Sequence, residues 1–369
     1  MKKSLLLALI MLAGPMDAQD KICSLIVGTY TDSCESKGIY VYDFSTDTGD
    51  FSLKAAAEDV SNPSYLSVSQ GNNFLYCINE NGKESTASSF AFDSKSGKLK
   101  LLNRQQTHGA DPCYIINNDR NVISANYSGG NITVFGKNSD GSLTEAKQIV
   151  QHSGNSANKK RQESAHVHAV HFSPDQKFVL ANDLGMDKIL VYSYDKDAPD
   201  AILKLKQTVN AKPGSGPRHL AFSNDGKFVY VLHELDGSLV AYRYKKGRLE
   251  KVQESTVIAK DFKGEASAAA ICISPDGNFL YASNRGDANT VSTFAISKNG
   301  TLGLIGQIDS KGKEPRDIAI DPTGKFLLAA HQKSDNIVIF KIDNATGKLS
   351  DTGKRIKLCA PVCLAFAKY

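Results

Sequence analysis

The sequence repeats one pattern of strand, turn and strand along nearly its whole length, and this repeat restricts the fold more than any other feature. The clearest copy spans residues 217–234, where two alternating apolar segments flank a turn at residues 224–227, a pattern typical of a β-hairpin. Further copies begin at residues 271 and 315, looser ones begin at residues 63, 112 and 167, and residues 361–366 repeat the first half alone. One supersecondary unit is therefore used many times.

The spacing of the repeat identifies the architecture. A third strand and a fourth strand, such as residues 336–340 and those after Gly347, complete each unit. A period near 50 residues built from short strands is typical of a β-propeller blade. Seven units of four strands predict an all-β, seven-bladed β-propeller, and the apolar residues that open the hairpins follow one another at intervals of 46 to 55 residues: Leu66, Ile115, Val170, Leu220, Ile271, Ile318 and Leu364.

The two ends of the repeat complement each other. Residues 22–30 resemble the second strand of a unit with no first strand before them, and residues 361–366 resemble a first strand with no second strand after them. Pairing the two in one blade would remove the free sheet edges of an open ring. We therefore expect residues 19–369 to form a single propeller domain in which both termini close one blade.

The first 18 residues have a different character. Lys2 and Lys3 precede an apolar run over residues 5–13, and Ala18 offers a small residue at a cleavage site, so residues 1–18 are expected to be a signal peptide. The apolar run is too short to span a membrane as a helix. The sequence thus predicts a periplasmic or secreted protein.

Charge and cysteine content restrict the partners. The net charge is +5 and the basic residues are scattered among acidic ones, which gives no reason to expect nucleic acid or a membrane surface as a partner. We expect a monomer.

The chain has seven cysteines, and because the number is odd they cannot all pair within the chain. Most are expected to be small buried hydrophobes, with Cys34 the best candidate for exposure.

Aligning the repeats brings distant polar residues into register. Some lie two positions before an opening apolar residue, and others lie at the end of the second strand of a unit. The inner strands of a propeller line its channel, so these two positions should meet at one end of it. The residues expected there, or directly beside these positions, are Glu80, His166, His168, Arg218, His219, Glu234, Arg285 and Arg316.

The chemistry of this cluster suggests an anionic ligand. Cationic groups outnumber carboxylates, which favours a bound anion or a developing oxyanion. The alternative is that arginines and glutamates simply pair across the channel. His166 and His168 have the spacing of a metal-binding pair, but no third ligand follows nearby, so we expect no metal or cofactor and a hydrogen-bonding or acid/base role instead.

The longest irregular stretch precedes the histidine-rich strand. Residues 151–165 are polar, contain Lys159, Lys160 and Arg161, and lengthen the spacing of the repeat to 55 residues. Such an insertion is either a lid over a site or a solvated loop. The sequence does not distinguish the two.

Several motifs resemble a known family, the seven-bladed lactonase group that includes bacterial cycloisomerase-type 6-phosphogluconolactonases and fungal carboxy-muconate lactonizing enzymes. The likeness covers nearly the whole chain after residue 18. It implies that His168 (or His166), Arg218, Glu234 and Arg285 line the active site. The motifs that carry it are His166-Val167-His168, Gly216-Pro217-Arg218-His219, His233-Glu234-Leu235, Ser283-Asn284-Arg285 and Glu314-Pro315-Arg316-Asp317.

The resemblance and the cluster together predict a hydrolase that opens a small anionic sugar lactone by water attack. Hydrolysis needs a base, here Glu234 or His168, and an oxyanion stabiliser, here Arg218. Anchoring the substrate falls to Arg285 and Arg316, helped by His166, His219 and Glu80. Ala270 stands where family members usually have an acidic residue, so two alternatives stay open: a non-catalytic binding or scaffold propeller, and a muconate-type cycloisomerase.

Overall fold

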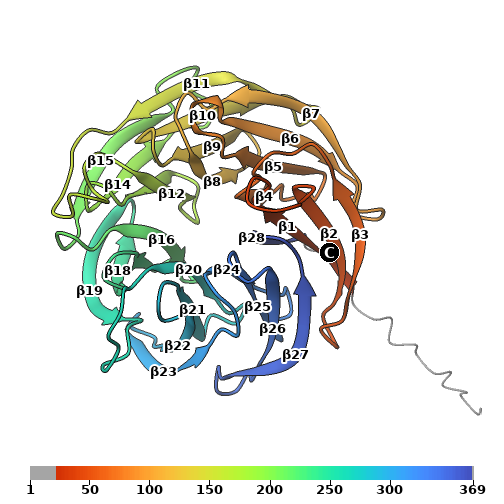
Figure 1. Ribbon diagram of the computed structural model, residues 1–369. Helices are drawn as coiled ribbons and strands as arrows, with labels where there is room; N and C mark the ends of the chain where they lie inside the picture. The colour runs from red at the N-terminus through yellow and green to blue at the C-terminus, as the bar shows by residue number, and fades with distance from the viewer. Residues whose placement is uncertain (1–21, 368–369) are drawn as a thin grey trace, which may run out of the picture.

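The chain forms a closed ring of seven four-stranded antiparallel sheets around a central channel, in a computed structural model that describes residues 22–367 (Figure 1). The predicted seven-bladed propeller is thereby confirmed. The predicted signal peptide at residues 1–18 lies outside the described residues. Within the described part of the chain, no helix has the length and apolar character needed to cross a membrane.

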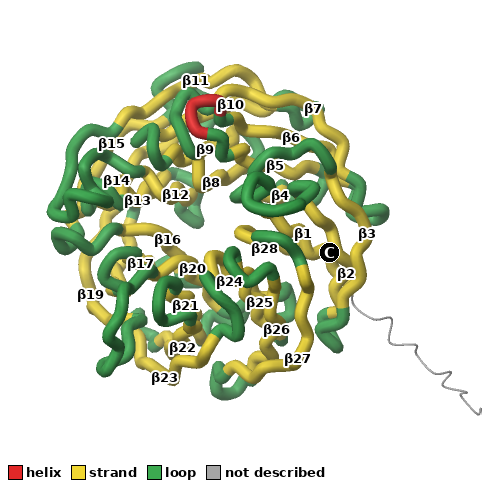
Figure 2. Tube along the Cα trace, in the orientation of Figure 1, coloured by secondary structure: helices red, strands yellow, loops and turns green. Residues whose placement is uncertain are grey.

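Strands run from the channel outward within each blade. Blade 1 takes its innermost strand from the end of the chain. The single 3-10 helix of the described residues, η1 (Gly82–Glu84), belongs to the connection between the second and third strands of blade 2 and is drawn red in Figure 2. The strands are β28 (Pro361–Ala367), β1 (Ile22–Thr29), β2 (Ile39–Ser45) and β3 (Phe51–Ala57) in blade 1, β4 (Leu66–Val68), β5 (Phe74–Asn79), β6 (Thr86–Phe92) and β7 (Leu99–Gln106) in blade 2, and β8 (Pro112–Asn117), β9 (Asn121–Asn126), β10 (Asn131–Lys137) and β11 (Leu143–Gln151) in blade 3.

The remaining four blades follow the chain without interruption. Each begins at the channel and ends at the rim. Their strands are β12 (Val167–Phe172), β13 (Phe178–Asp183), β14 (Lys188–Tyr194) and β15 (Leu203–Asn210) in blade 4, β16 (Pro217–Phe222), β17 (Phe228–His233), β18 (Ser238–Lys245) and β19 (Arg248–Thr256) in blade 5, β20 (Ala268–Ile273), β21 (Phe279–Asn284), β22 (Thr290–Ile296) and β23 (Leu302–Asp309) in blade 6, and β24 (Pro315–Ile320), β25 (Phe326–His331), β26 (Asn336–Ile342) and β27 (Leu349–Lys357) in blade 7.

The middle strands are apolar on both faces because each blade packs between two neighbours. In β1, Leu25 and Val27 belong to a core shared with Leu328 of blade 7, whereas Ile26 belongs to a core shared with Leu75 of blade 2. Successive side chains of a strand point to opposite faces, so a strand buried on both sides reads as a continuous apolar run. The hydrophobic core is therefore a series of layers between blades.

A glycine turn and an aromatic ring make one of the repeated contacts between blades. Gly347, in the turn between β26 and β27, has a φ of +72°, and a Cβ atom there would lie 2.4 Å from the ring of Phe279 in blade 6. The hydroxyl of Tyr281 donates to the Gly347 carbonyl at 2.9 Å. The turn therefore requires glycine both for its conformation and for the close approach of the neighbouring blade.

The ring closes by pairing the two ends of the chain. β28 runs antiparallel to β1, with Leu364 opposite Val27, and β28 also contacts β24 on one side and β4 on the other. Asp317 on β24 accepts a hydrogen bond from the Leu364 amide at 2.8 Å. The expectation that both termini build one blade is confirmed.

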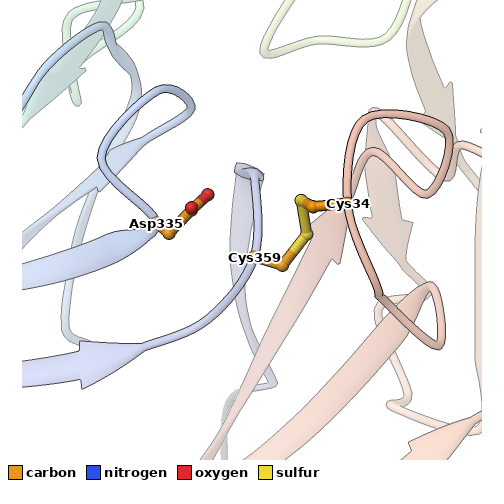
Figure 3. A group of neighbouring side chains, drawn as sticks. All are labelled: Cys34, Asp335 and Cys359. Atoms are coloured by element: carbon orange, nitrogen blue, oxygen red, sulfur yellow. A yellow bond between two sulfur atoms is a disulfide. The ribbon is translucent and has the colours of Figure 1, made fainter.

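A disulfide adds a covalent link at the same place. Cys34, in the loop after β1, bonds to Cys359, just before β28, across a sequence separation of 325 residues (Figure 3). Asp335 lies beside this bond and accepts a hydrogen bond from the Ala360 amide at 2.8 Å. Cys34, the cysteine that the sequence favoured as the exposed one, is half-buried and paired, and the sequence did not indicate its partner. The five remaining cysteines are free, and all but the half-buried Cys272 are buried.

Breaking the disulfide should lower stability. We expect Cys34→Ser to reduce the free energy of unfolding of the oxidised protein by about 2 to 4 kcal/mol, because the cross-link restricts the unfolded chain over a long loop. Chemical denaturation measures the loss. Cys359→Ser should give the same loss, and the double variant no more than either alone. Additive losses, or an unchanged wild-type midpoint after reduction, would contradict a stabilising cross-link.

Candidate active site

A cavity of about 270 Å³ lies at one end of the inner strands, and all seven blades contribute to it. The first strand of a blade begins where its antiparallel second strand ends, so both register positions meet there. Arg161 comes from the segment between β11 and β12. The lining residues are Tyr30, Glu80, Cys113, Tyr127, Arg161, His168, Glu234, Arg285 and Arg316.

One buried carboxylate organises the cationic side of this cavity. Glu234, directly after β17, accepts hydrogen bonds from Arg161 at 2.6 Å and Arg218 at 2.9 Å, and it forms an ion pair with Arg285 at 3.1 Å. Burial on its own would raise the pKa of Glu234, but the charges of Arg285 and then Arg218 hold that pKa well below its usual value. Glu234 is therefore an anion at any pH near neutrality.

His168 faces the same carboxylate without a direct bond to it. Its Nε2 atom lies 3.8 Å from Glu234 Oε2, and its Nδ1 atom lies 3.6 Å from the sulfur of Cys113. Burial, followed by the charge of Arg218, lowers the pKa of His168 well below the ordinary histidine value. The imidazole is therefore neutral at neutral pH, which is the form that accepts a proton.

The opposite wall of the cavity holds a second carboxylate and a second cation. Glu80 accepts hydrogen bonds from the hydroxyls of Tyr30 at 2.9 Å and Ser64 at 2.5 Å. The guanidinium of Arg316 lies 5.3 Å from the centre of the Tyr30 ring, in cation–π geometry. Arg316 lines the cavity and, among residues 22–367, forms no ion pair.

Three of the predicted residues stand behind the lining. Arg218 is almost completely buried and turns its Nη1 toward the Ala269 carbonyl and the Nε2 atom of His219. His219 is buried against the His168 ring, with ring centres 5.4 Å apart. His166 stacks on Tyr127 at 4.4 Å. The structure thus brings all eight predicted residues into one cluster, five of them in the lining.

Four lining residues were not among those expected from the sequence. In blade 3, Cys113 occupies the register position that His168 and Arg218 occupy in their blades, and Tyr127 lies at the end of a second strand. The repeat therefore places both residues at the cavity, but neither side chain is charged at neutral pH, so neither was selected. Tyr30 follows β1 in the blade closed by both termini. Arg161 lies in the polar insertion, where no repeat register exists.

Ala270 does not line the cavity. It is buried in the core between blades 6 and 7, and its amide donates to the Ser283 hydroxyl at 3.0 Å. Alanine at this position therefore leaves the charged groups of the cavity in place.

Arginine and glutamate also pair across the channel, which was the alternative to anion binding. However, three arginines share the single carboxylate of Glu234, so the cations are not each neutralised by a carboxylate of their own.

Comparison with known proteins gives consistent matches over nearly the whole chain. The family model of the seven-bladed β-propeller lactonases matches residues 24–366. A 6-phosphogluconolactonase of Bacillus subtilis is 33% identical over 345 residues, which are 92% of this chain and 97% of the relative. These matches span the blades and the loops that carry the cavity.

Two solved structures are also similar. A candidate 6-phosphogluconolactonase from Bacteroides fragilis is 42% identical, with a TM-score of 0.91 over 95% of this chain and 99% of that protein. A periplasmic gluconolactonase from Pseudomonas aeruginosa is 36% identical, with a TM-score of 0.90 over 94% of this chain and 99% of that protein. Both structures therefore share the fold of this chain and more than a third of its residues.

Removing the central carboxylate should destabilise the protein. Glu234→Gln leaves three guanidinium groups around a neutral amide, and we expect it to lower the free energy of unfolding by about 3 to 5 kcal/mol, the cost of breaking a buried ion pair. Chemical denaturation at neutral pH measures this. The matched control is Glu314→Gln, because Glu314 pairs with the exposed Lys333 and lies 4.0 Å from Arg285. A similar loss in both variants would contradict the central role of Glu234.

Proposed function

Because the chain belongs to the family of seven-bladed β-propeller lactonases, we propose that it hydrolyses a sugar-type lactone, most simply 6-phosphogluconolactone. Relatives at 33% and 42% identity carry the name 6-phosphogluconolactonase, the second as a candidate. The single observation that carries the proposal is the charge of the cavity. Four guanidinium groups stand at or directly behind its wall against two lining carboxylates, which favours a substrate with a negative group.

His168 is assigned as the base that activates water. It is neutral and borders the cavity, and Glu234 lies close enough to stabilise the imidazolium that forms when it takes a proton. Glu234 is less suited to this role, because both of its oxygens already accept hydrogen bonds from arginine donors. These contacts favour His168 over Glu234 as the base.

The reaction then proceeds without a covalent enzyme intermediate. The water oxygen bonds to the lactone carbonyl carbon while one water proton passes to His168, and the carbonyl electron pair moves onto the oxygen. Collapse of this intermediate breaks the bond to the ring oxygen, which takes the proton back from His168 and leaves a hydroxy acid. Burial raises the pKa of the Cys113 thiol, which keeps it protonated and favours water over sulfur as the nucleophile.

Three arginines are assigned the remaining roles, which are stabilising the oxyanion, anchoring the substrate and positioning Glu234. Arg285 is assigned to the oxyanion, because it reaches the cavity while its Nη2 is held by Glu234 and its Nε by the Ser267 carbonyl at 3.2 Å. Arg316 is assigned to the substrate's negative group. Arg218 does not line the cavity, so it is given a positioning role on Glu234 instead of direct oxyanion contact.

Export is proposed for this chain as well. The basic and apolar pattern of residues 1–18 supports it, and so does the Cys34–Cys359 disulfide, since disulfides persist in oxidising compartments. One similar structure is that of a periplasmic gluconolactonase. A periplasmic location implies a lactone supplied outside the cytoplasm.

Lactone hydrolysis tests the function directly. Purified protein should hydrolyse 6-phosphogluconolactone at least tenfold faster than the spontaneous reaction, and faster than it hydrolyses unphosphorylated gluconolactone, because the cavity offers cations for the phosphate. Acid release followed in a pH-stat measures both rates. Binding of 6-phosphogluconate without rate enhancement would instead support a non-catalytic propeller, and consumption of muconate-type dienes a cycloisomerase.

The pH dependence tests the assignment of His168. Because its pKa is lowered, His168 stays neutral through pH 6.5, where an ordinary histidine would gain a proton, so kcat/KM for unphosphorylated gluconolactone, corrected for spontaneous hydrolysis, should remain flat across that pH. His168→Gln should reduce kcat by about 100-fold or more. His166→Gln is the control and should lose much less, since His166 is not in the cavity wall. A loss of wild-type activity centred near pH 6.5 would contradict the assignment.

A further inference from the structure

Arg161 occupies a special place among the cations of the cavity. It lies between β11 and β12 and reaches over the cavity, where its Nη2 donates to Glu234 Oε1 at 2.6 Å and to the Tyr127 hydroxyl at 3.2 Å. The insertion that carries it, residues 151–165, thus forms part of the wall of the site. A purely solvated loop, the other interpretation of the sequence, is wrong.

The insertion is held firmly on both sides of Arg161. At its start, His152 binds the Asp183 carboxylate and the Tyr192 hydroxyl, each at 2.7 Å, in a buried cluster. Next to Arg161, the fully buried Gln162 donates to the Leu184 carbonyl at 2.8 Å. The backbone that presents Arg161 is therefore fixed, whereas its side chain extends from that anchor toward the cavity.

Exposure separates Arg161 from the other two arginines on Glu234. Its side chain is 41% exposed, compared with 2% for Arg218 and 9% for Arg285. Both of its side-chain hydrogen bonds within residues 22–367 use Nη2, which leaves the donors of Nε and Nη1 unused. Arg161 thus has unused donors at an accessible position, and releasing Nη2 from Glu234 would complete the pair of donors that an anion binds in bidentate fashion.

Glu234 does not depend on Arg161 alone for its charge balance. If Arg161 moves away, Glu234 Oε2 keeps its bonds to Arg218 and Arg285, both of which are buried. Releasing Arg161 therefore costs less than releasing either buried arginine, because its side chain is already 41% exposed and its charge can return to water. The geometry allows Arg161 to exchange partners while the rest of the cluster stays intact.

We propose that Arg161 is the specificity-determining residue that leaves Glu234 to bind the phosphate group of the lactone substrate. This assignment rests on the lactone hydrolysis proposed above. A phosphate monoester carries close to two negative charges at neutral pH and accepts forked guanidinium donors. Those charges match the excess of four guanidinium groups over the two lining carboxylates, because Glu314, near Arg285, is already paired with Lys333.

Steady-state kinetics on two lactones tests this role. Arg161→Gln should raise KM for 6-phosphogluconolactone by about 10- to 100-fold, the factor for a lost hydrogen bond to a charged group, with kcat within a few-fold. KM for unphosphorylated gluconolactone should stay unchanged. Arg161→Lys, which keeps the charge but not the fork, should fall in between. Lys160→Gln is the matched control, because it removes the same charge from an exposed neighbour.

Direct binding separates this inference from the proposed activity. Isothermal titration with 6-phosphogluconate and gluconate should show that the wild type prefers the phosphorylated acid and that Arg161→Gln loses this preference. That result in a protein that hydrolyses no lactone would overturn the hydrolase proposal alone and support phosphate binding by Arg161. Equal losses on both lactones and both acids would show that Arg161 acts through Glu234, and no change would show that the phosphate binds elsewhere; either result overturns the inference.

Discussion

The antiparallel pairing of β28 with β1 is the interaction on which the rest of this structure depends. It joins the last strand of the chain to the first described one and makes both part of the same sheet, so that blade 7 and blade 2 each find a neighbour. A ring open at this point would leave two sheet edges and two apolar layers in water. Since the cavity takes residues from every blade, its geometry is fixed only when the ring is closed.

The disulfide and the cavity lie close to each other on this closed ring. Cys34 follows Tyr30 in the loop after β1, and the Tyr30 amide donates to the carbonyl of Ala360, the residue next to Cys359. The Tyr30 hydroxyl in turn donates a hydrogen bond to Glu80, and the Tyr30 ring makes a cation–π contact with Arg316. The same segment therefore closes the ring and forms one wall of the cavity, which links the stability of the closure to the geometry of the site.

The other wall depends on the cost of burying charge. Glu234 and Arg218 are nearly inaccessible to solvent, and burying either of them alone would be very unfavourable. Together with Arg285 they form a set of ion pairs that neutralises the carboxylate and still leaves cationic character at the cavity. A protein that must hold an anion and stabilise an oxyanion benefits from such a fixed arrangement, because little reorganisation is needed when charge develops.

The sequence by itself determined the architecture and the register of the site. Each hairpin encodes its own strands and turns, and the period of about 50 residues together with the incomplete units at both ends was enough to predict seven blades and their closure. The same register brought His168, Glu234 and Arg285 to one place, because equivalent positions of a repeat occupy equivalent positions of a ring.

Tertiary structure alone decided which of these residues face the cavity and which support them. Arg218 shares its register position with Arg316, yet it is turned toward Glu234 and buried, because the strands of neighbouring blades surround it differently. The partner of Cys34 and the direction of Arg161 lie in loops outside the repeat, so no periodicity specifies them. A repeat determines the backbone that recurs, whereas contacts made once in the molecule depend on side chains that meet only after the ring has closed.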